Sequence, residues 1–256
     1  MPTFRDSLSP ARPAERSLRV ALGGGRKTTV HVLRLPRFAY AARVVRLSPA
    51  ARLRDWCERS GTGYALIGGF YVRATGIPLG ALQIGGRAVP SAPFDSPWDR
   101  IRACVHCQNG TVSLRSRLEL PGEPRGDLMQ AGPMLVRSGV RLVEPGADPE
   151  GFSAGSRQFD SDITVGRYPR AALGLSADEL IAVVCEGRTD DEAGLTLTEL
   201  AQAMIELGAE DAINLDGGGS ASLIAGGRLV NTPREEGGAE IPGGREVPTA
   251  LRFTLR

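Results

Sequence analysis

One stretch of the sequence decides the expected fold, residues 180–220, which read LIAVVCEGRTDDEAGLTLTELAQAMIELGAEDAINLDGGGS. The apolar run over 180–184 predicts a buried strand. A helix should follow, because Thr196 and Glu199 form a capping box and the next apolar residues recur at helical spacing. A second strand is expected over 211–215. Strand, helix and strand in this order predict a crossover unit whose two strands are parallel.

Each predicted strand of this unit is followed by a carboxylate and then glycine, at Glu186 and at Asp216. Ligands collect at the carboxyl ends of parallel strands. If the strands are neighbours, the two carboxylates lie on one rim about 5–9 Å apart, the range of acid/base pairs that cleave glycosides. If another strand lies between them, the carboxylates separate further. We therefore predict Asp216 as the leading catalytic residue and Glu186 as its partner.

The segment after Asp216 consists of Gly217, Gly218, Gly219 and Ser220. Successive glycine amides can approach a ligand closely and cradle an anion, so the segment predicts a phosphate site. The alternative is a plain turn capped by the aspartate, although such turns need fewer glycines.

Two arginines and one glycine pair are further candidates for substrate binding. Arg188 follows Glu186 and can hold a phosphate through two parallel hydrogen bonds; otherwise it forms a surface ion pair. Arg170 precedes another apolar run, but arginine is abundant in this chain, so its signal is weaker. Gly68 and Gly69, before Phe70, could place backbone and an aromatic ring against a sugar, or form a β-bulge or tight packing.

The expected fold class is α+β, with a mixed, partly parallel β-sheet and a few flanking helices in a single domain. Residues 1–16 are expected to be a flexible tail before a domain over 17–256. A helix is expected from Ser48 to Arg59, and residues 144–162 are expected to form a long loop.

Composition narrows the class of protein. Lys plus Arg is 31 and Asp plus Glu is 29, and this balance argues against a dedicated nucleic-acid binder. No apolar run approaches the ~20 residues that span a bilayer, and no secretory signal precedes the first strands. We therefore expect a cytoplasmic protein with reduced cysteines and no membrane partner. The sequence does not indicate the oligomeric state.

The segment Cys104-Val105-His106-Cys107 resembles half of a metal site. A structural zinc needs four ligands, and no second Cys/His pair is present. We interpret the segment as an ordinary strand and expect no cofactor. A divalent cation held by carboxylates is the alternative.

Several of these motifs occur in the order typical of one family and resemble the phosphodiester glycosidases over about residues 60–256. The matching segments are Gly68-Gly69-Phe70-Tyr71, Ala131-Gly132-Pro133-Met134-Leu135-Val136, Pro169-Arg170-Ala171-Ala172-Leu173-Gly174, Glu186-Gly187-Arg188, Leu197-Thr198-Glu199-Leu200-Ala201, Asn214 to Ser220, and Asn231-Thr232-Pro233. The resemblance adds Asn231 to the expected substrate contacts. This chain departs from the family pattern at Ile67, where asparagine is usual, at Glu186, where aspartate is usual, and at Ala171, where threonine is common.

Three functions follow from these features. The resemblance implies an enzyme that hydrolyses the glycosidic C–O bond of a sugar-1-phosphodiester, with Arg170 and Arg188 on the phosphate. The second is a metal-dependent phosphodiesterase that cleaves the P–O bond. The third is a non-catalytic protein that binds sugar phosphates, which the departures at Ile67 and Glu186 suggest.

Overall fold

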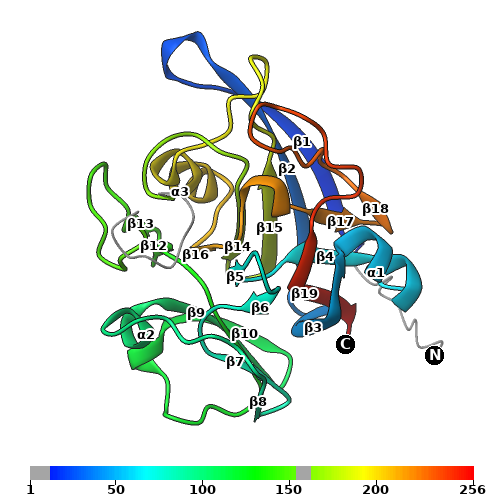
Figure 1. Ribbon diagram of the computed structural model, residues 1–256, viewed down its shortest axis with the longest axis vertical. Coiled ribbons are helices and arrows are strands. Elements are labelled where there is room, and N and C mark those ends of the chain that lie inside the picture. Colours follow the sequence, from blue (N-terminus) through cyan, green and yellow to red (C-terminus); the bar gives the residue numbers. More distant parts are fainter. Residues whose placement is uncertain (1–11, 154–162) are drawn as a thin grey trace, which may run out of the picture.

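The computed structural model describes residues 12–153 and 163–256, and its described part is built from antiparallel sheets with few helices. The seven-stranded sheet has the order β1-β2-β15-β14-β16-β12-β13. Its strands are β1 (Ala14–Ala21), β2 (Lys27–Pro36), β12 (Met134–Arg137), β13 (Val140–Arg141), β14 (Ala171–Leu175), β15 (Glu179–Cys185) and β16 (Asp211–Asn214). The helix α3 (Leu197–Glu206) connects β15 to β16 (Figure 1).

Two five-stranded sheets complete most of the molecule (Figure 1). The first, in the order β10-β9-β11-β7-β8, contains β7 (Leu82–Ile84), β8 (Arg87–Ala88), β9 (Ala103–Gln108), β10 (Thr111–Ser116) and β11 (Asp127–Gln130). The second, in the order β18-β17-β4-β19-β3, contains β3 (Tyr40–Arg52), β4 (Tyr64–Ile67), β17 (Leu223–Ala225), β18 (Arg228–Leu229) and β19 (Glu246–Leu255). The short strands β5 (Tyr71–Val72) and β6 (Ile77–Pro78) pair with each other. The remaining short elements are α1 (Leu53–Ser60), α2 (Trp98–Ile101) and the 3₁₀ turns at Gly23–Gly25, Arg117–Glu119 and Gly218–Ser220.

The predicted α+β class with a mixed, partly parallel sheet is wrong, because the described part of the chain is β-rich and has few helices. Every pairing between the strands given above is antiparallel. The helix α3 does join two strands that run in the same direction, but β14 lies between them and is antiparallel to each. The sequence gives β14 and β15 as apolar runs separated by the short turn over 176–178, which is a hairpin pattern. The first strand of that hairpin, β14, therefore lies between β15 and β16, which the crossover was expected to pair directly.

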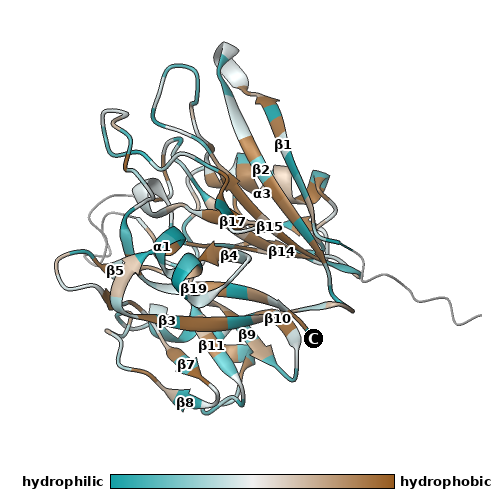
Figure 2. Cartoon of the chain, turned by 90° about the vertical axis from the view of Figure 1, so that its right-hand side faces the viewer, coloured by the Kyte–Doolittle hydropathy of each residue, from teal (hydrophilic) through white to brown (hydrophobic). Residues whose placement is uncertain are grey.

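Alternation along the strands explains how the seven-stranded sheet is covered on both faces. Neighbouring residues of a strand point to opposite faces. On β15, Ala182 faces the core shared with the two five-stranded sheets, whereas Ile181 and Val183 face the core under α3. Both faces of β15 are therefore buried, which accounts for its unbroken apolar sequence. Figure 2 shows apolar segments along β3, β14 and β15, and hydrophilic loops around them.

Two sequence boundaries also need correction. Residues 48–52 continue β3, so α1 begins at Leu53 rather than at Ser48, and Gly61 ends it in the left-handed conformation. The strand β1 begins at Ala14, so it includes the end of the predicted tail.

The capping box of α3 is confirmed, with Thr196 and Glu199 bonding reciprocally. Of the predicted long loop, residues 154–162 lie outside the described residues. No helix in the described ranges is both long and apolar enough to cross a bilayer.

Candidate active site

A cavity of about 340 Å³ opens at the edge of the seven-stranded sheet where β15 and β16 end and β14 begins. Because β14 is antiparallel to its two neighbours, its first residues reach the same edge as their last residues. The segment around β5 closes the opposite side. The cavity is lined by Phe70, Tyr71, Val72, Arg73, Ala74, Ile163, Tyr168, Pro169, Arg170, Arg188, Asn214, Leu215, Asp216, Gly217, Gly218, Ser220 and Arg245.

Asp216 supplies the cavity's negative charge. Its Oδ1 accepts a hydrogen bond of 2.9 Å from the Gly217 amide, and its own amide donates to the Gly68 carbonyl at 3.1 Å. Its Oδ2 is buried and has no hydrogen-bond partner among the described residues. Burial raises the pKa of Asp216 to about 6, although Ser220, the Gly217 amide and two arginines of the cavity partly oppose this. At neutral pH the ionised form of this carboxyl group therefore predominates.

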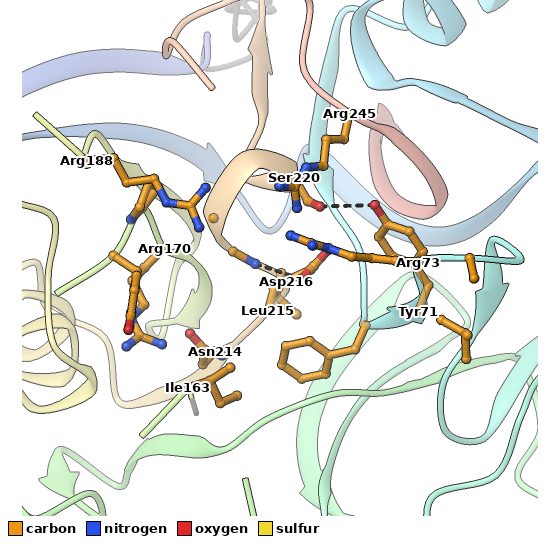
Figure 3. A pocket seen from close by; sticks show the side chains of 17 residues that line it. Tyr71, Arg73, Ile163, Arg170, Arg188, Asn214, Leu215, Asp216, Ser220 and Arg245 are labelled. Atoms are coloured by element: carbon orange, nitrogen blue, oxygen red, sulfur yellow. Dashed lines mark hydrogen bonds between the residues drawn. The ribbon is translucent and has the colours of Figure 1, made fainter. Parts of the chain in front are cut away.

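Tyr71 and Ser220 lie beside Asp216. Their hydroxyl oxygens are 3.3 Å apart (Figure 3). Burial is the main reason that the pKa of Tyr71 is raised, and the charge of Asp216 adds to it. The phenol therefore stays protonated and can donate a hydrogen bond into the cavity.

Four arginines surround Asp216 in the cavity. In the view of Figure 3, Arg170 and Arg188 lie to the left of Asp216 and Arg245 lies above it. The side chain of Arg73 enters from the right and extends over Asp216. Among the described residues that line the cavity, these cations face a single carboxylate, so the cavity favours an anionic ligand.

The arginine side chains are held differently. Arg170 is buried and donates from Nε to the Leu195 carbonyl at 2.9 Å. Arg188 donates from Nη1 to the Arg234 carbonyl at 2.6 Å, and burial, followed by repulsion from Arg245, lowers its pKa. Arg188 also has a φ of 71°, which is uncommon outside glycine and typical of constrained functional sites.

The glycine turn serves close packing more than anion binding. The Gly217 amide donates to Asp216, and the Gly218 amide donates to the Pro169 carbonyl at 2.8 Å. A Cβ on Gly217 would lie 2.8 Å from that carbonyl oxygen, and one on Gly219 would lie 2.6 Å from Ile241. Two of the amides predicted to cradle phosphate are therefore already engaged within the protein, and the glycines allow neighbouring segments to approach.

Glu186 does not line the cavity. Its Oε1 lies 3.0 Å from His31 Nε2 and accepts a 2.9 Å hydrogen bond from the Thr232 amide. The intervening strand β14 separates the end of β15 from the end of β16. This is the alternative in which a strand between β15 and β16 separates Glu186 from Asp216.

Other predicted contacts have structural partners. Asn231 is buried and bonds the Leu223 amide at 3.1 Å and the Ala221 carbonyl at 2.8 Å. A Cβ on Gly68 would lie 2.4 Å from Thr249 Oγ1.

Along the same segment, the Gly69 amide donates to Met129 Sδ at 3.1 Å. The buried Ile67 packs in the core. Phe70 does line the cavity, and its ring centroid is 5.5 Å from that of Phe152.

Arg73 and Arg245 line the cavity, although no sequence motif includes them. Tyr71, Tyr168 and Asn214 also line it. Tyr71 and Asn214 belong to matching motifs and Tyr168 directly precedes one, but none of the three was selected as a site residue. Arg73, two residues beyond the motif that ends at Tyr71, could have been found from its position, whereas nothing marks Arg245 among so many arginines.

Within the two described ranges, no group of three His, Cys, Asp or Glu side chains is placed to hold a metal ion. His106 Nε2 lies 2.7 Å from the Arg125 carbonyl, and all four cysteines are buried free thiols.

The sequence matches the family model described as phosphodiester glycosidase over residues 60–254. It is 29% identical over 188 residues to N-acetylglucosamine-1-phosphodiester alpha-N-acetylglucosaminidase of Mus musculus, and 29% identical over 192 residues to that of Bos taurus. Each match covers 72% of this chain, but 36% and 35% of the mouse and bovine proteins. The chain thus spans about a third of the length of these relatives.

Solved structures share the fold. The zebrafish N-acetylglucosamine-1-phosphodiester alpha-N-acetylglucosaminidase catalytic domain, auto-inhibited by its pro-peptide, has a TM-score of 0.73 at 20% identity, covering 98% of this chain and 85% of that one. A hypothetical protein from Synechocystis has a TM-score of 0.65 at 17% identity, with coverage of 95% and 62%.

Proposed function

Because the chain belongs to the phosphodiester glycosidase family, we propose that it hydrolyses the glycosidic bond of a sugar-1-phosphodiester in the cavity around Asp216. One observation carries the proposal: the carboxyl group of Asp216, whose pKa burial raises to about 6, faces a cavity lined by arginines. A glycosyl phosphodiester needs both features, since its sugar carbon becomes positive as the anionic phosphate departs.

In this proposal Asp216 acts at the anomeric carbon, either by direct attack or by activating water. If Asp216 activates water, it accepts a proton as the water oxygen bonds to the anomeric carbon. If it attacks directly, it forms a glycosyl ester that water then cleaves, which regenerates the carboxylate. In both routes the C–O bond to the phosphate breaks, its oxygen leaves with the phosphate monoester, and the proton from water passes to that phosphate or to solvent. Arg73, Arg188 and Arg245 stabilise the departing anion, so the reaction needs little help from a general acid. Tyr71 donates a hydrogen bond from the same side.

We assign Glu186 a positioning role rather than a catalytic one. Its carboxylate accepts hydrogen bonds away from the cavity, and it ties His31 to the backbone at Thr232. Arg170 is likewise assigned to the cavity wall, because its guanidinium donates to the Leu195 carbonyl.

The names of the mouse and bovine relatives make N-acetylglucosamine-1-phosphodiesters the first substrates to test. A panel of sugar-1-phosphodiesters should be assayed with the wild-type protein and with Asp216→Asn. We expect turnover of at least one diester by the wild-type protein, and a loss of about 10³-fold or more in Asp216→Asn with an unchanged circular dichroism spectrum. Equal activity in both would remove Asp216 from the chemistry.

Hydrolysis in ¹⁸O-labelled water separates the proposal from P–O cleavage. The label should appear in the released sugar. Label in the phosphate instead would identify a phosphodiesterase, and an added chelator would then test whether that reaction needs a metal.

A further inference from the structure

A second cavity, of about 570 Å³, opens beside the first. It is lined by Ala50, Tyr71, Arg73, Ala74, Thr75, Gly76, Glu235, Arg245 and Glu246. Tyr71, Arg73, Ala74 and Arg245 line both cavities, so these side chains form the boundary between them.

The boundary carries two positively charged side chains, Arg73 and Arg245, and Arg245 forms an ion pair with Glu235. Arg245 donates from Nε to Glu235 at 2.8 Å. The pKa of Glu235 is lowered first by its hydrogen bond with Arg245, and also by the charges of Arg73 and Arg188. On the other side of the boundary, the charges of Arg245 and Arg73 partly oppose the rise that burial causes in the pKa of Asp216. An anion bound between Asp216 and the second cavity would therefore meet several arginines at once.

The two ester oxygens of a phosphodiester bound at this boundary point in different directions from the tetrahedral phosphorus. If the sugar occupies the first cavity next to Asp216, the other ester oxygen can direct its substituent into the second cavity. That substituent is the aglycone, the group on the far side of the phosphate from the sugar.

The lining of the second cavity also includes two carboxylates, Glu235 and Glu246. Glu246 is the first residue of β19 and is exposed. Arg52 is its neighbour on β3, but the salt bridges among the described residues do not include Glu246. Glu235 is also there, but its charge is largely balanced by Arg245. Glu246 is thus the carboxylate available to an incoming group, and it would attract a cation and repel an anion.

We propose that the second cavity is the aglycone site, and that Glu246 makes it favour an aglycone that carries an amine over one that carries a carboxylate. This inference rests on the proposed function, because it concerns the other half of the same substrate.

The test compares three diesters of one sugar, chosen as the sugar that turns over fastest in the panel. Their aglycones are 2-aminoethyl, 2-hydroxyethyl and carboxymethyl groups, which are similar in size and differ in charge. We expect kcat/KM to fall in that order, with a ratio of about 3–10 between the amine and the carboxylate, as suits exposed charges in water. The difference should lie mainly in KM and shrink in high salt.

Glu246→Gln should bring the ratio of amine to carboxylate to about 2 or less, because only the charge is removed. Glu206→Gln is the matched control: it removes an exposed carboxylate on α3 outside both cavities, and the ratio should stay at the wild-type value.

The outcomes distinguish this inference from the proposed function. If no diester is hydrolysed, the proposed function fails and the inference falls with it. If diesters are hydrolysed at rates that do not depend on aglycone charge, or if Glu246→Gln keeps the wild-type ratio, the inference alone is overturned.

Discussion

At the scale of single residues, Asp216 combines burial with one unsatisfied oxygen, and this combination suits a charged reactive group. The Gly217 amide holds Oδ1, while the buried Oδ2 lacks a partner among the described residues. An unsatisfied buried acceptor costs stability. Such a cost is typical of functional sites, where the missing partner is the ligand.

The rate should report the titration of Asp216. Because its pKa is raised to about 6, the carboxylate is protonated in acid and ionised above neutrality. We expect kcat/KM of the wild-type enzyme to rise with pH through about 6 and then level off, since the phosphodiester keeps its charge throughout this range. A profile that is flat from pH 5 to 7.5 would contradict the need for the ionised form.

At the scale of elements, the glycine turn after β16 is fixed by its neighbours. Gly217→Ala would place a Cβ 2.8 Å from the Pro169 carbonyl oxygen, a backbone atom that cannot easily move. We expect the free energy of unfolding to fall by about 1–3 kcal/mol, measured by urea denaturation. Turnover should fall as well, because the turn carries Asp216.

Gly63→Ala is the control for this variant. A Cβ there meets no atom within 4 Å, and its φ is not positive. Its stability should be unchanged or slightly raised. Equal losses in both variants would show that the turn at Gly217 has room for a side chain.

The Glu186 side chain connects two elements, because it contacts His31 on β2 and the backbone of Thr232 in the segment after β18. In Glu186→Gln an amide oxygen can still accept from the Thr232 amide, so we expect turnover within about threefold of wild type. Glu186→Ala leaves both partners unsatisfied, and stability should fall by about 1–3 kcal/mol. If both variants fold normally but lose turnover as Asp216→Asn does, Glu186 takes part in the chemistry.

At the scale of the whole molecule, buried carboxyl groups should make stability depend on pH. Burial raises the pKa of Asp216 to about 6 and that of Glu150 to about 7. For both groups the folded state binds the proton more tightly than the unfolded state. Their stabilisation is therefore complete below the unfolded pKa of about 4 and is lost as pH rises through about 6 and 7.

Other carboxylates act in the opposite direction. The pKa values of Glu192, Glu199 and Glu235 are lowered, so their contributions are lost as pH falls below about 4.5. We expect the wild-type protein to be most stable near pH 5, and to lose on the order of 4 kcal/mol between pH 5 and 8 in urea unfolding. Asp216→Asn should lose less over that interval; an identical loss would mean that Asp216 is not part of the effect.

Much of the local structure could be predicted from sequence. The capping box of α3, the apolar runs of β2 and β15, and the carboxylate after β16 are set by neighbours in the chain. Segments on which the resemblance rests, before β14, after β15 and after β16, all reach the cavity.

The pairing of the strands could not be predicted in this way. The backbone of β15 can form hydrogen bonds with any neighbouring strand, so its sequence does not specify which strands lie beside it. A crossover through α3 allows another strand to lie between β15 and β16. The hairpin from β14 to β15 competes for the same position and forms over a short turn. This one choice made the sheet antiparallel and set Glu186 apart from the cavity.

By itself, then, the sequence determined the residue types that the site needs and the elements that present them, because capping, alternation and turn chemistry act over a few residues. Only the tertiary structure decided which of those residues meet. Arg73 comes from the loop after β5 and Arg245 from the segment just before β19, and no local pattern links them to Asp216. They come together because segments that are distant in the sequence pair in the sheets. Those pairings are stabilised by contacts that exist only in the folded protein.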